Sequence, residues 1–198
     1  MGPVDDAVTP QPSAPLVVQD AAAWRAWLDE NEDTSDGVWL ILAKKGTTSP
    51  TSVSYAEALD EALCSGWIDG QRKSHDAMTF LQRFTPRRTR SLWSLRNLDL
   101  VAGLIAQARM RSRGLDEIEK AKRDGRWERA YAGPAAATVP DDLAAALARE
   151  PEAEKVFAAL KSQERYAVLH PIMTAATSAT REKRIARQIE LLMQRAGG

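Results

Sequence analysis

The sequence has little of what disulfide-bonded, metal-binding and membrane-spanning proteins need. It holds a single cysteine, Cys64, so no disulfide can form within one chain. Its two histidines, His75 and His170, belong to no cluster with metal-ligand spacing. No apolar run approaches the roughly 20 residues that a membrane-spanning helix needs. We therefore expect no metal, no cofactor and no membrane span.

The first 19 residues also lack the pattern of a secretory leader. They contain four prolines and the acids Asp5 and Asp6, with neither a basic start nor an apolar stretch. Such a composition is typical of a disordered tail. Together with the single cysteine, which suits a reducing compartment, it predicts a cytoplasmic location.

Charge is unevenly spread, although the formal net charge is zero. Residues 1–71 hold 3 Lys and Arg against 12 Asp and Glu, whereas residues 72–113 hold 10 against 2. A basic block of this kind is typical of an anion-binding face. It can equally neutralise an acidic segment within the same fold, so charge alone leaves both interpretations open.

Apolar periodicity predicts a mixed first part. The expected elements are a helix at 21–30, a strand at 38–45, a helix at 55–64 and a hairpin of strands at 67–73 and 78–84. Asp20 is the N-cap candidate of the first helix, and Ser54 with Glu57 forms a capping box for the second, which Gly66 ends. The strand at 38–45 is apolar throughout, which indicates a central, buried strand.

The rest of the chain is predicted to be helical. The expected helices span residues 98–111, 115–123, 141–149, 151–161, 163–176 and 181–195. Their N-cap candidates include Asn97, Asp141 and Thr180. Gly114 is expected to break the helix before it, and Pro171 to kink the one that contains it.

These elements predict an α+β fold. A small, about three-stranded, antiparallel or mixed sheet is packed by helices and followed by an all-helical C-terminal region. The predicted division is a disordered tail at 1–19, an α+β domain at 20–131, a linker rich in Ala and Pro at 132–140, and the helical region at 141–198.

Two residues could carry catalysis, and each has a structural explanation. Cys64 lies on an apolar stripe at a helix C-terminus, where the helix dipole disfavours a thiolate. We therefore interpret it as a buried structural cysteine rather than a nucleophile paired with His75. Asp69 could act as an acid/base, but an ion pair with Arg72 or Arg87, or a turn hydrogen bond, explains it as well. No catalytic residue is assigned.

A run of arginines followed by a tryptophan is the strongest binding signal. Arg87, Arg88 and Arg90 precede Trp93. Guanidinium groups beside an aromatic plate suit phosphate, nucleotide or single-stranded nucleic acid. The structural alternative makes Trp93 a core residue and the arginines a solvated rim, or pairs them with Asp60, Glu61 and Asp69.

Recognition of duplex DNA is disfavoured. Residues 98–111, a turn at 112–114 and residues 115–123 have the order of a helix-turn-helix. The second helix, however, carries Asp116, Glu117 and Glu119 where base contacts are made, and these carboxylates repel phosphates.

A set of short motifs runs through residues 20–195. They are Trp24-x-x-Trp27-Leu28, Val38-Trp39-Leu40, Lys44-Lys45-Gly46, Tyr55-x-Glu57-Ala58, Glu61-Ala62-Leu63-Cys64-x-Gly66-Trp67-Ile68-Asp69-Gly70, Phe84-Thr85-Pro86-Arg87-Arg88, Ser91-x-Trp93-Ser94-x-x-Asn97, Gly125-Arg126-Trp127, Arg165-Tyr166-Ala167-Val168-Leu169 and Thr180-Arg181-x-x-Arg184-Ile185. The set resembles the YdeI/OmpD-associated (OmdA) family of bacteriocin-protection proteins. The resemblance implies a protective role by name, and it brings no reaction, cofactor or catalytic residue to carry over.

The sequence therefore favours a non-catalytic stress-protection or binding protein with an anion- or ligand-binding face. The candidate ligand-binding residues are Lys44, Trp67, Asp69, Arg72, Lys73, Arg87, Arg88, Trp93 and Asn97. One alternative is an enzyme acting on a small phosphorylated ligand, with Asp69 as acid/base. Another is an interaction module whose basic loop docks an acidic protein on a flat surface. The expected partner is thus a small anionic ligand or an acidic protein.

Overall fold

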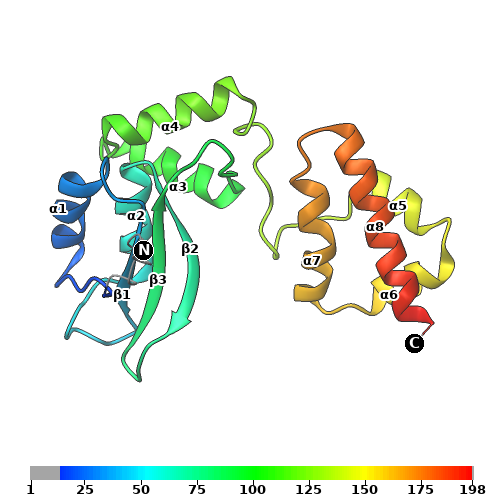
Figure 1. Cartoon of the computed structure of the whole chain (residues 1–198), viewed down its shortest axis with the longest axis horizontal. Helices are drawn as coiled ribbons and strands as arrows, with labels where there is room; N and C mark the ends of the chain where they lie inside the picture. The colour runs from blue at the N-terminus through cyan, green and yellow to red at the C-terminus, as the bar shows by residue number, and fades with distance from the viewer. Residues whose placement is uncertain (1–13, 198) are drawn as a thin grey trace, which may run out of the picture. The chain divides into compact units, whose positions relative to one another are not determined.

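The computed structural model describes residues 14–197 and has the predicted α+β class (Figure 1). Its elements are α1 (Ala21–Asn31), β1 (Val38–Ala43), α2 (Tyr55–Cys64), β2 (Trp67–Ser74), β3 (Thr79–Pro86), α3 (Leu95–Ala106), α4 (Ser112–Arg123), α5 (Asp141–Leu147), α6 (Pro151–Ala159), α7 (Ser162–Met173) and α8 (Ser178–Ala196). They divide into two compact units. The first holds the described residues up to Arg88 and Ala108–Asp116, and the second holds Thr89–Gln107 and the described residues from Glu117 onward.

The sheet is antiparallel, with the strand order β1-β3-β2. The prediction that the apolar strand β1 is central was therefore wrong, because β3 lies between the other two. The outer edge of β1 is covered instead by Leu16, whose N–H donates to the Trp39 carbonyl at 2.7 Å and whose carbonyl accepts from the Ile41 N–H at 2.9 Å. A covered edge strand can be apolar along its whole length, because its exposed backbone groups are satisfied.

This bridge also corrects the predicted tail. Residues 14–19 were assigned to a disordered segment, but Leu16 pairs with β1 and Val18 is buried. The rest of that segment, residues 1–13, lies outside the described residues.

Trp24 joins the helices of the first unit to its sheet. Its ring is fully buried and stacks on Trp27 at 5.3 Å between centroids, while it meets Trp67 of β2 and Phe84 of β3 at 6.5 and 5.6 Å. Its indole N–H donates to the Ala58 carbonyl of α2 at 3.1 Å. One side chain thus contacts α2 and two strands, so Trp24 packs α1 and α2 against the inner face of the sheet.

The ends of α2 are as predicted. The Ser54 hydroxyl accepts from the Glu57 N–H, and the Glu57 carboxylate accepts from the Ser54 N–H at 2.9 Å, which completes the capping box. Gly66 follows the helix with φ of 70°, the left-handed conformation that glycine adopts at low cost.

Several other predicted helix ends were wrong. α3 begins three residues early because Ser94, not Asn97, is its N-cap, and it ends at Ala106. α4 begins at Ser112 and contains Gly114, so the turn of the supposed helix-turn-helix does not exist. Likewise Thr177 rather than Thr180 caps α8, and Asp141 is the first residue of α5 after Pro140. Short Ser, Thr and Asp side chains three residues apart compete for the same capping role, so sequence alone misplaces them.

The C-terminal helices have a hydrophobic core of their own. Its buried members are Leu143, Leu147, Ala153, Phe157, Val168, Leu169, Ile172, Ile185 and Leu192. They come from α5, α6, α7 and α8, and α8 packs against the other three helices. Pro151 occupies the first turn of α6 as predicted, and Pro171 lies inside α7.

Candidate functional site

Four of the nine candidate ligand-binding residues lie in the interior. Trp67 is fully buried, and Trp93, Arg87 and Asn97 keep 1%, 6% and 7% of their surface. Trp93 and Asn97 belong to the second unit, where Trp93 packs on Trp127 with 5.1 Å between ring centroids. Trp93 is therefore a core residue, as the alternative to a binding role had it.

Three other candidates lie toward the hairpin end of the sheet, on or directly after its two outer strands. Lys44 follows β1, while Arg72 and Lys73 lie on β2 opposite Gln82 and Leu81 of β3. All three cations are exposed. We call Lys44, Arg72 and Lys73 the sheet-end cations.

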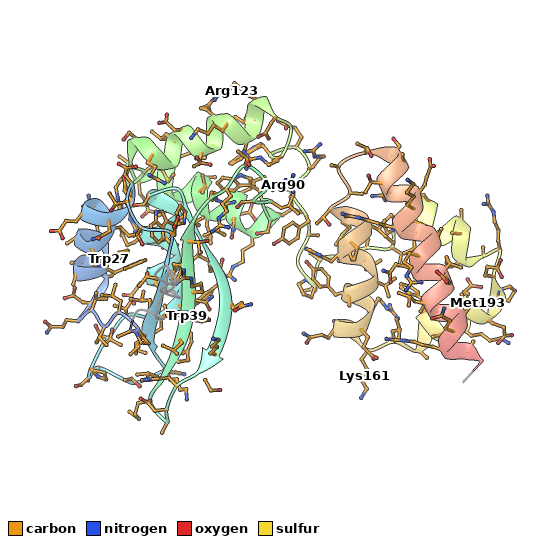
Figure 2. The ribbon with its side chains drawn as sticks, viewed as in Figure 1. Trp27, Trp39, Arg90, Arg123, Lys161 and Met193 are labelled. Atoms are coloured by element: carbon orange, nitrogen blue, oxygen red, sulfur yellow. The ribbon has the colours of Figure 1, made fainter. Side chains whose placement is uncertain are left out.

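Two of the sheet-end cations lie over aromatic rings. The Arg72 guanidinium carbon lies 3.8 Å from the centre of the Phe80 ring, and Lys73 Nζ lies 4.3 Å from the centre of the Trp39 ring, which is labelled in Figure 2. Consecutive residues of a strand point to opposite faces. Arg72 and Lys73 therefore flank the β2 edge from its two sides.

Lys44 holds the hairpin turn. Its Nζ donates to the carbonyls of Asp76 and Ala77 at 2.6 and 3.2 Å. Asp76 in turn accepts the N–H groups of Met78 and Thr79, and hydrogen bonding to the Thr79 side chain and to these two N–H groups lowers the pKa of its carboxyl. The turn is thus a closed network of hydrogen bonds that places Lys44 beside the hairpin.

A bulge in β2 separates the sheet-end cations from the start of the strand. The register shifts between Asp69 and Arg72, and the buried Gln82 side chain donates to the carbonyls of Gly70 and Gln71 at 2.9 and 3.2 Å. Bulges and charged side chains are common devices that protect an exposed strand edge.

Asp69 has a different partner from those predicted. Its Oδ2 accepts a hydrogen bond from the Tyr55 hydroxyl at 2.8 Å. This hydrogen bond ties the start of α2 to β2, and sequence reasoning missed it because Tyr55 lies 14 residues away on another element. Arg88, the remaining candidate, is exposed in the segment that follows β3.

A charged cluster in the first unit was not predicted. Glu61, buried on α2, accepts from Arg109 Nη2 at 2.7 Å and Arg111 Nη1 at 3.1 Å. Arg111 Nε also contacts Ser65 Oγ at 3.0 Å and Asp29 Oδ1 at 2.8 Å. The hydrogen bond to Glu61 raises the pKa of Arg109. Glu61 was considered as a partner of the arginines at 87–90, but its partners come from the segment before α4.

Cys64, His75 and His170 occupy different environments. Cys64 is buried as predicted, and burial, with the Glu61 carboxylate nearby, raises the pKa of its thiol. His75 Nδ1 lies 2.7 Å from Thr79 Oγ1 and contacts Asp76. Burial lowers the pKa of His170. Within residues 14–197, no three His, Cys, Asp or Glu side chains are grouped to hold a metal ion.

Comparison with known families identifies both parts of the chain. Residues 16–117, just over half of the chain, match the model of a domain of unknown function, DUF8412, so the chain belongs to that family. Residues 136–195 match the OmdA model, described as bacteriocin-protection, YdeI or OmpD-associated. The resemblance seen in the sequence is thus confirmed for the C-terminal part. Neither the curated proteins nor the solved structures gave a match. Among the described residues, every helix is too short or too polar to cross a bilayer.

Proposed function

We propose that this protein is a non-catalytic binding protein whose sheet-end cations, Lys44, Arg72 and Lys73, bind anionic groups. The observation that carries the proposal is the placement of Arg72 and Lys73 over the rings of Phe80 and Trp39. A cation held on an aromatic ring has lost much of its rotational freedom before an anion arrives. Ordering these long side chains therefore costs less on binding.

The shape of the surface favours a multivalent anion. Because Arg72 and Lys73 flank the β2 edge from opposite sides, one small phosphate reaches only one of them. A chain of phosphates, or an acidic peptide laid along the edge, reaches both.

The proposal includes a cytoplasmic location and a protective role. The single buried cysteine, Cys64, suits a reducing compartment. The OmdA model carries bacteriocin protection in its description. Fractionation of cells that express the full chain tests the location.

Binding is tested by thermal shift with polyphosphate, nucleotides, sugar phosphates, short oligonucleotides and acidic peptides. An anion at about 100 times its dissociation constant stabilises the folded protein by about 2.7 kcal/mol. We expect this shift with the multivalent anions and its loss in Arg72→Gln/Lys73→Gln. The matched control, Lys155→Gln/Lys183→Gln, removes the same charge from exposed sites on α6 and α8. Equal loss in both variants, or no shift with any anion, contradicts the proposal.

A further inference from the structure

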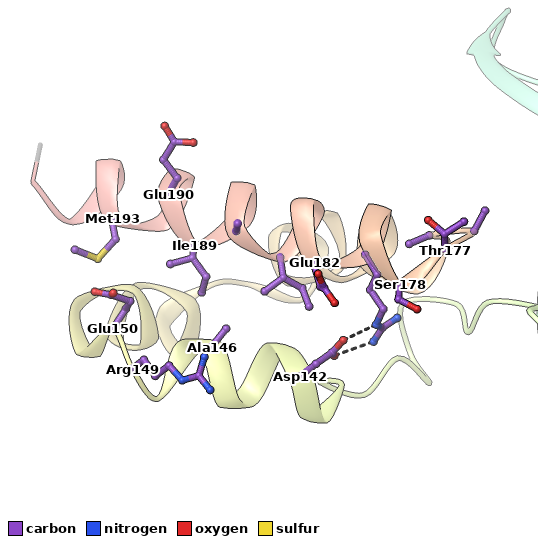
Figure 3. A pocket seen from close by; sticks show the side chains of 15 residues that line it. Asp142, Ala146, Arg149, Glu150, Thr177, Ser178, Glu182, Ile189, Glu190 and Met193 are labelled. Carbon is purple, nitrogen blue, oxygen red and sulfur yellow. Dashed lines mark hydrogen bonds and ion pairs between the residues drawn. The ribbon is translucent and has the colours of Figure 1, made fainter.

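A groove in the OmdA-matching part runs between α5 and α8 (Figure 3). Its volume is about 1100 Å³, and its apolar lining includes Ala146 of α5 and Ile185, Ala186, Ile189 and Met193 of α8. Ile185 belongs to the buried core, whereas Met193 keeps 38% of its surface exposed. The groove is therefore a place where the core of the helical region reaches the surface.

The groove has the length of a short helix. α8 lines it from Ser178 to Met193, which at 1.5 Å per residue is about 22 Å. Its apolar members Ile185, Ile189 and Met193 recur every four residues. This is the pattern that receives an amphipathic helix with anchors at matching spacing. Methionine adapts its shape to different partners, which suits it to the end of such a groove.

Acidic side chains outnumber basic ones around the groove. Asp142 and Arg181 neutralise each other, with Arg181 Nη2 donating to Asp142 Oδ1 at 2.9 Å. The other charged lining residues are Glu150, Glu182, Glu190 and Arg149. Glu190 also accepts from Arg187 at 2.6 Å, and Figure 3 draws its side chain away from α5. Glu150, Glu182 and Arg149 thus remain, which leaves two carboxylates against one guanidinium at the groove.

Two other candidate occupants of the groove, the N-terminal segment of this chain and a second copy of it, carry the same sign of charge as the groove. The N-terminal segment at residues 1–13 contains Asp5 and Asp6 and no Lys or Arg, so its charge has the same sign as the groove. A second copy could bind through its own groove about a two-fold axis. Its Glu150 and Glu182 would then face the acidic groove of the first copy. Like charges facing each other across an interface oppose association.

We infer that the groove between α5 and α8 binds a cationic amphipathic helix of another polypeptide. Its apolar residues lie on Ile185, Ile189 and Met193, and its Lys or Arg side chains reach Glu150 and Glu182. This site is separate from the sheet-end cations, so either proposal can fail without the other.

The test uses the full chain and a fluorescein-labelled peptide of about 16 residues, the length that spans the groove as a helix. The peptide carries Leu on one face and Lys on the other, and a second peptide carries Glu in place of Lys. Fluorescence anisotropy gives each affinity. We expect the Lys peptide to bind at least about tenfold more tightly than the Glu peptide, and more weakly as salt rises.

Variants then locate the site. Glu150→Lys/Glu182→Lys should weaken the Lys peptide at least about tenfold and strengthen the Glu peptide. The control Glu128→Lys/Glu152→Lys makes the same charge change at exposed positions outside the groove and should leave both affinities unchanged. Met193→Asp should weaken both peptides by removing an apolar contact. Circular dichroism confirms that each variant is folded.

Three results overturn the inference: equal binding of the two peptides, no binding by the wild type at millimolar concentration, and equal effects of the groove and control variants. A dimer in sedimentation that Met193→Asp dissociates also overturns it, because the occupant is then a second copy.

Discussion

Gly114 of α4 packs directly against the carbonyl of Cys64 at the end of α2. A Cβ built on Gly114 would overlap that carbonyl oxygen and would stand 2.8 Å from Met110 Cε. The Arg111 N–H donates to the same carbonyl at 3.1 Å. The close approach explains why a glycine occupies the first turn of α4, although Gly114 was expected to lie in a turn between two helices.

Replacing Gly114 by alanine should therefore destabilise the protein, although alanine favours helix. The added methyl group meets backbone, which cannot rotate away, and overpacking of this kind costs about 1–3 kcal/mol. Gly103 in α3 is the matched control, because its added Cβ meets nothing nearer than Gln107 Nε2 at 3.9 Å. Gly103→Ala should stabilise by about 0.5–1 kcal/mol. Denaturant unfolding measures both, and a stabilised Gly114→Ala would contradict the packing described.

Removing the buried carboxylate of Glu61 should be costly. Glu61→Ala leaves Arg109 and Arg111 without their shared acceptor, and breaking a buried ion pair in this way costs about 3–5 kcal/mol. Asp60 is the next residue on the same helix, and it is more exposed and lies 3.7 Å from Arg109. Asp60→Ala should cost less than about 1 kcal/mol. Equal losses in the two variants would show that the cluster does not stabilise the fold.

The ion pair of Asp142 and Arg181 should add stability that depends on pH. The hydrogen bond from Arg181 lowers the pKa of Asp142, so the folded carboxyl ionises at lower pH than the unfolded one. The contribution is present above the unfolded pKa of about 3.9 and is lost as pH falls through the folded pKa.

Asp142→Asn should lower the free energy of unfolding by about 0.2–1 kcal/mol at neutral pH, because the pair is partly exposed. The variant and wild type should converge as pH falls from the unfolded pKa of about 3.9 through the lower folded pKa, and 1 M salt should narrow the difference at neutral pH. Thermal unfolding from pH 2 to 7 measures this. A difference that grows on acidification has the opposite sign and refutes the assignment.

We propose, as the sequence predicts, that residues 132–140 separate an α+β domain at 20–131 from a helical region at 141–198. The OmdA match begins at residue 136, and residues 132–140 contain a turn but neither helix nor strand. Elastase, which cuts after small residues, should cleave first among the alanines there and leave two stable fragments. A first cut within residues 20–131 would contradict the division.

Local patterns predicted the elements of this fold well. The capping box at Ser54 and Glu57, the stop at Gly66 and the hairpin all follow from residues close together in the chain. The strand order does not, because the apolar run of β1 suits a central strand and an edge strand covered by Leu16 equally. Gly114 was misread for a similar reason: its partner, Cys64, lies 50 residues earlier, and only the fold brings them together.

The candidate site was predicted less well than the fold. The basic block mixes two kinds of arginine that sequence cannot separate. Arg72 is exposed over Phe80, whereas Arg87 is buried, so replacing Arg87 would confuse lost binding with lost packing. No sequence motif marks the groove between α5 and α8, because its lining residues are spread over α5, α8 and the segments next to them.

The most direct test of the anion-binding account is a nuclear magnetic resonance titration of the ¹⁵N-labelled full chain with polyphosphate. The account predicts that the largest amide shifts cluster around Lys44, directly after β1, and around Arg72 and Lys73 on β2, and that Arg72→Gln/Lys73→Gln abolishes them. Shifts centred on Asp69 or Arg88, or no shifts at saturating polyphosphate, would contradict it.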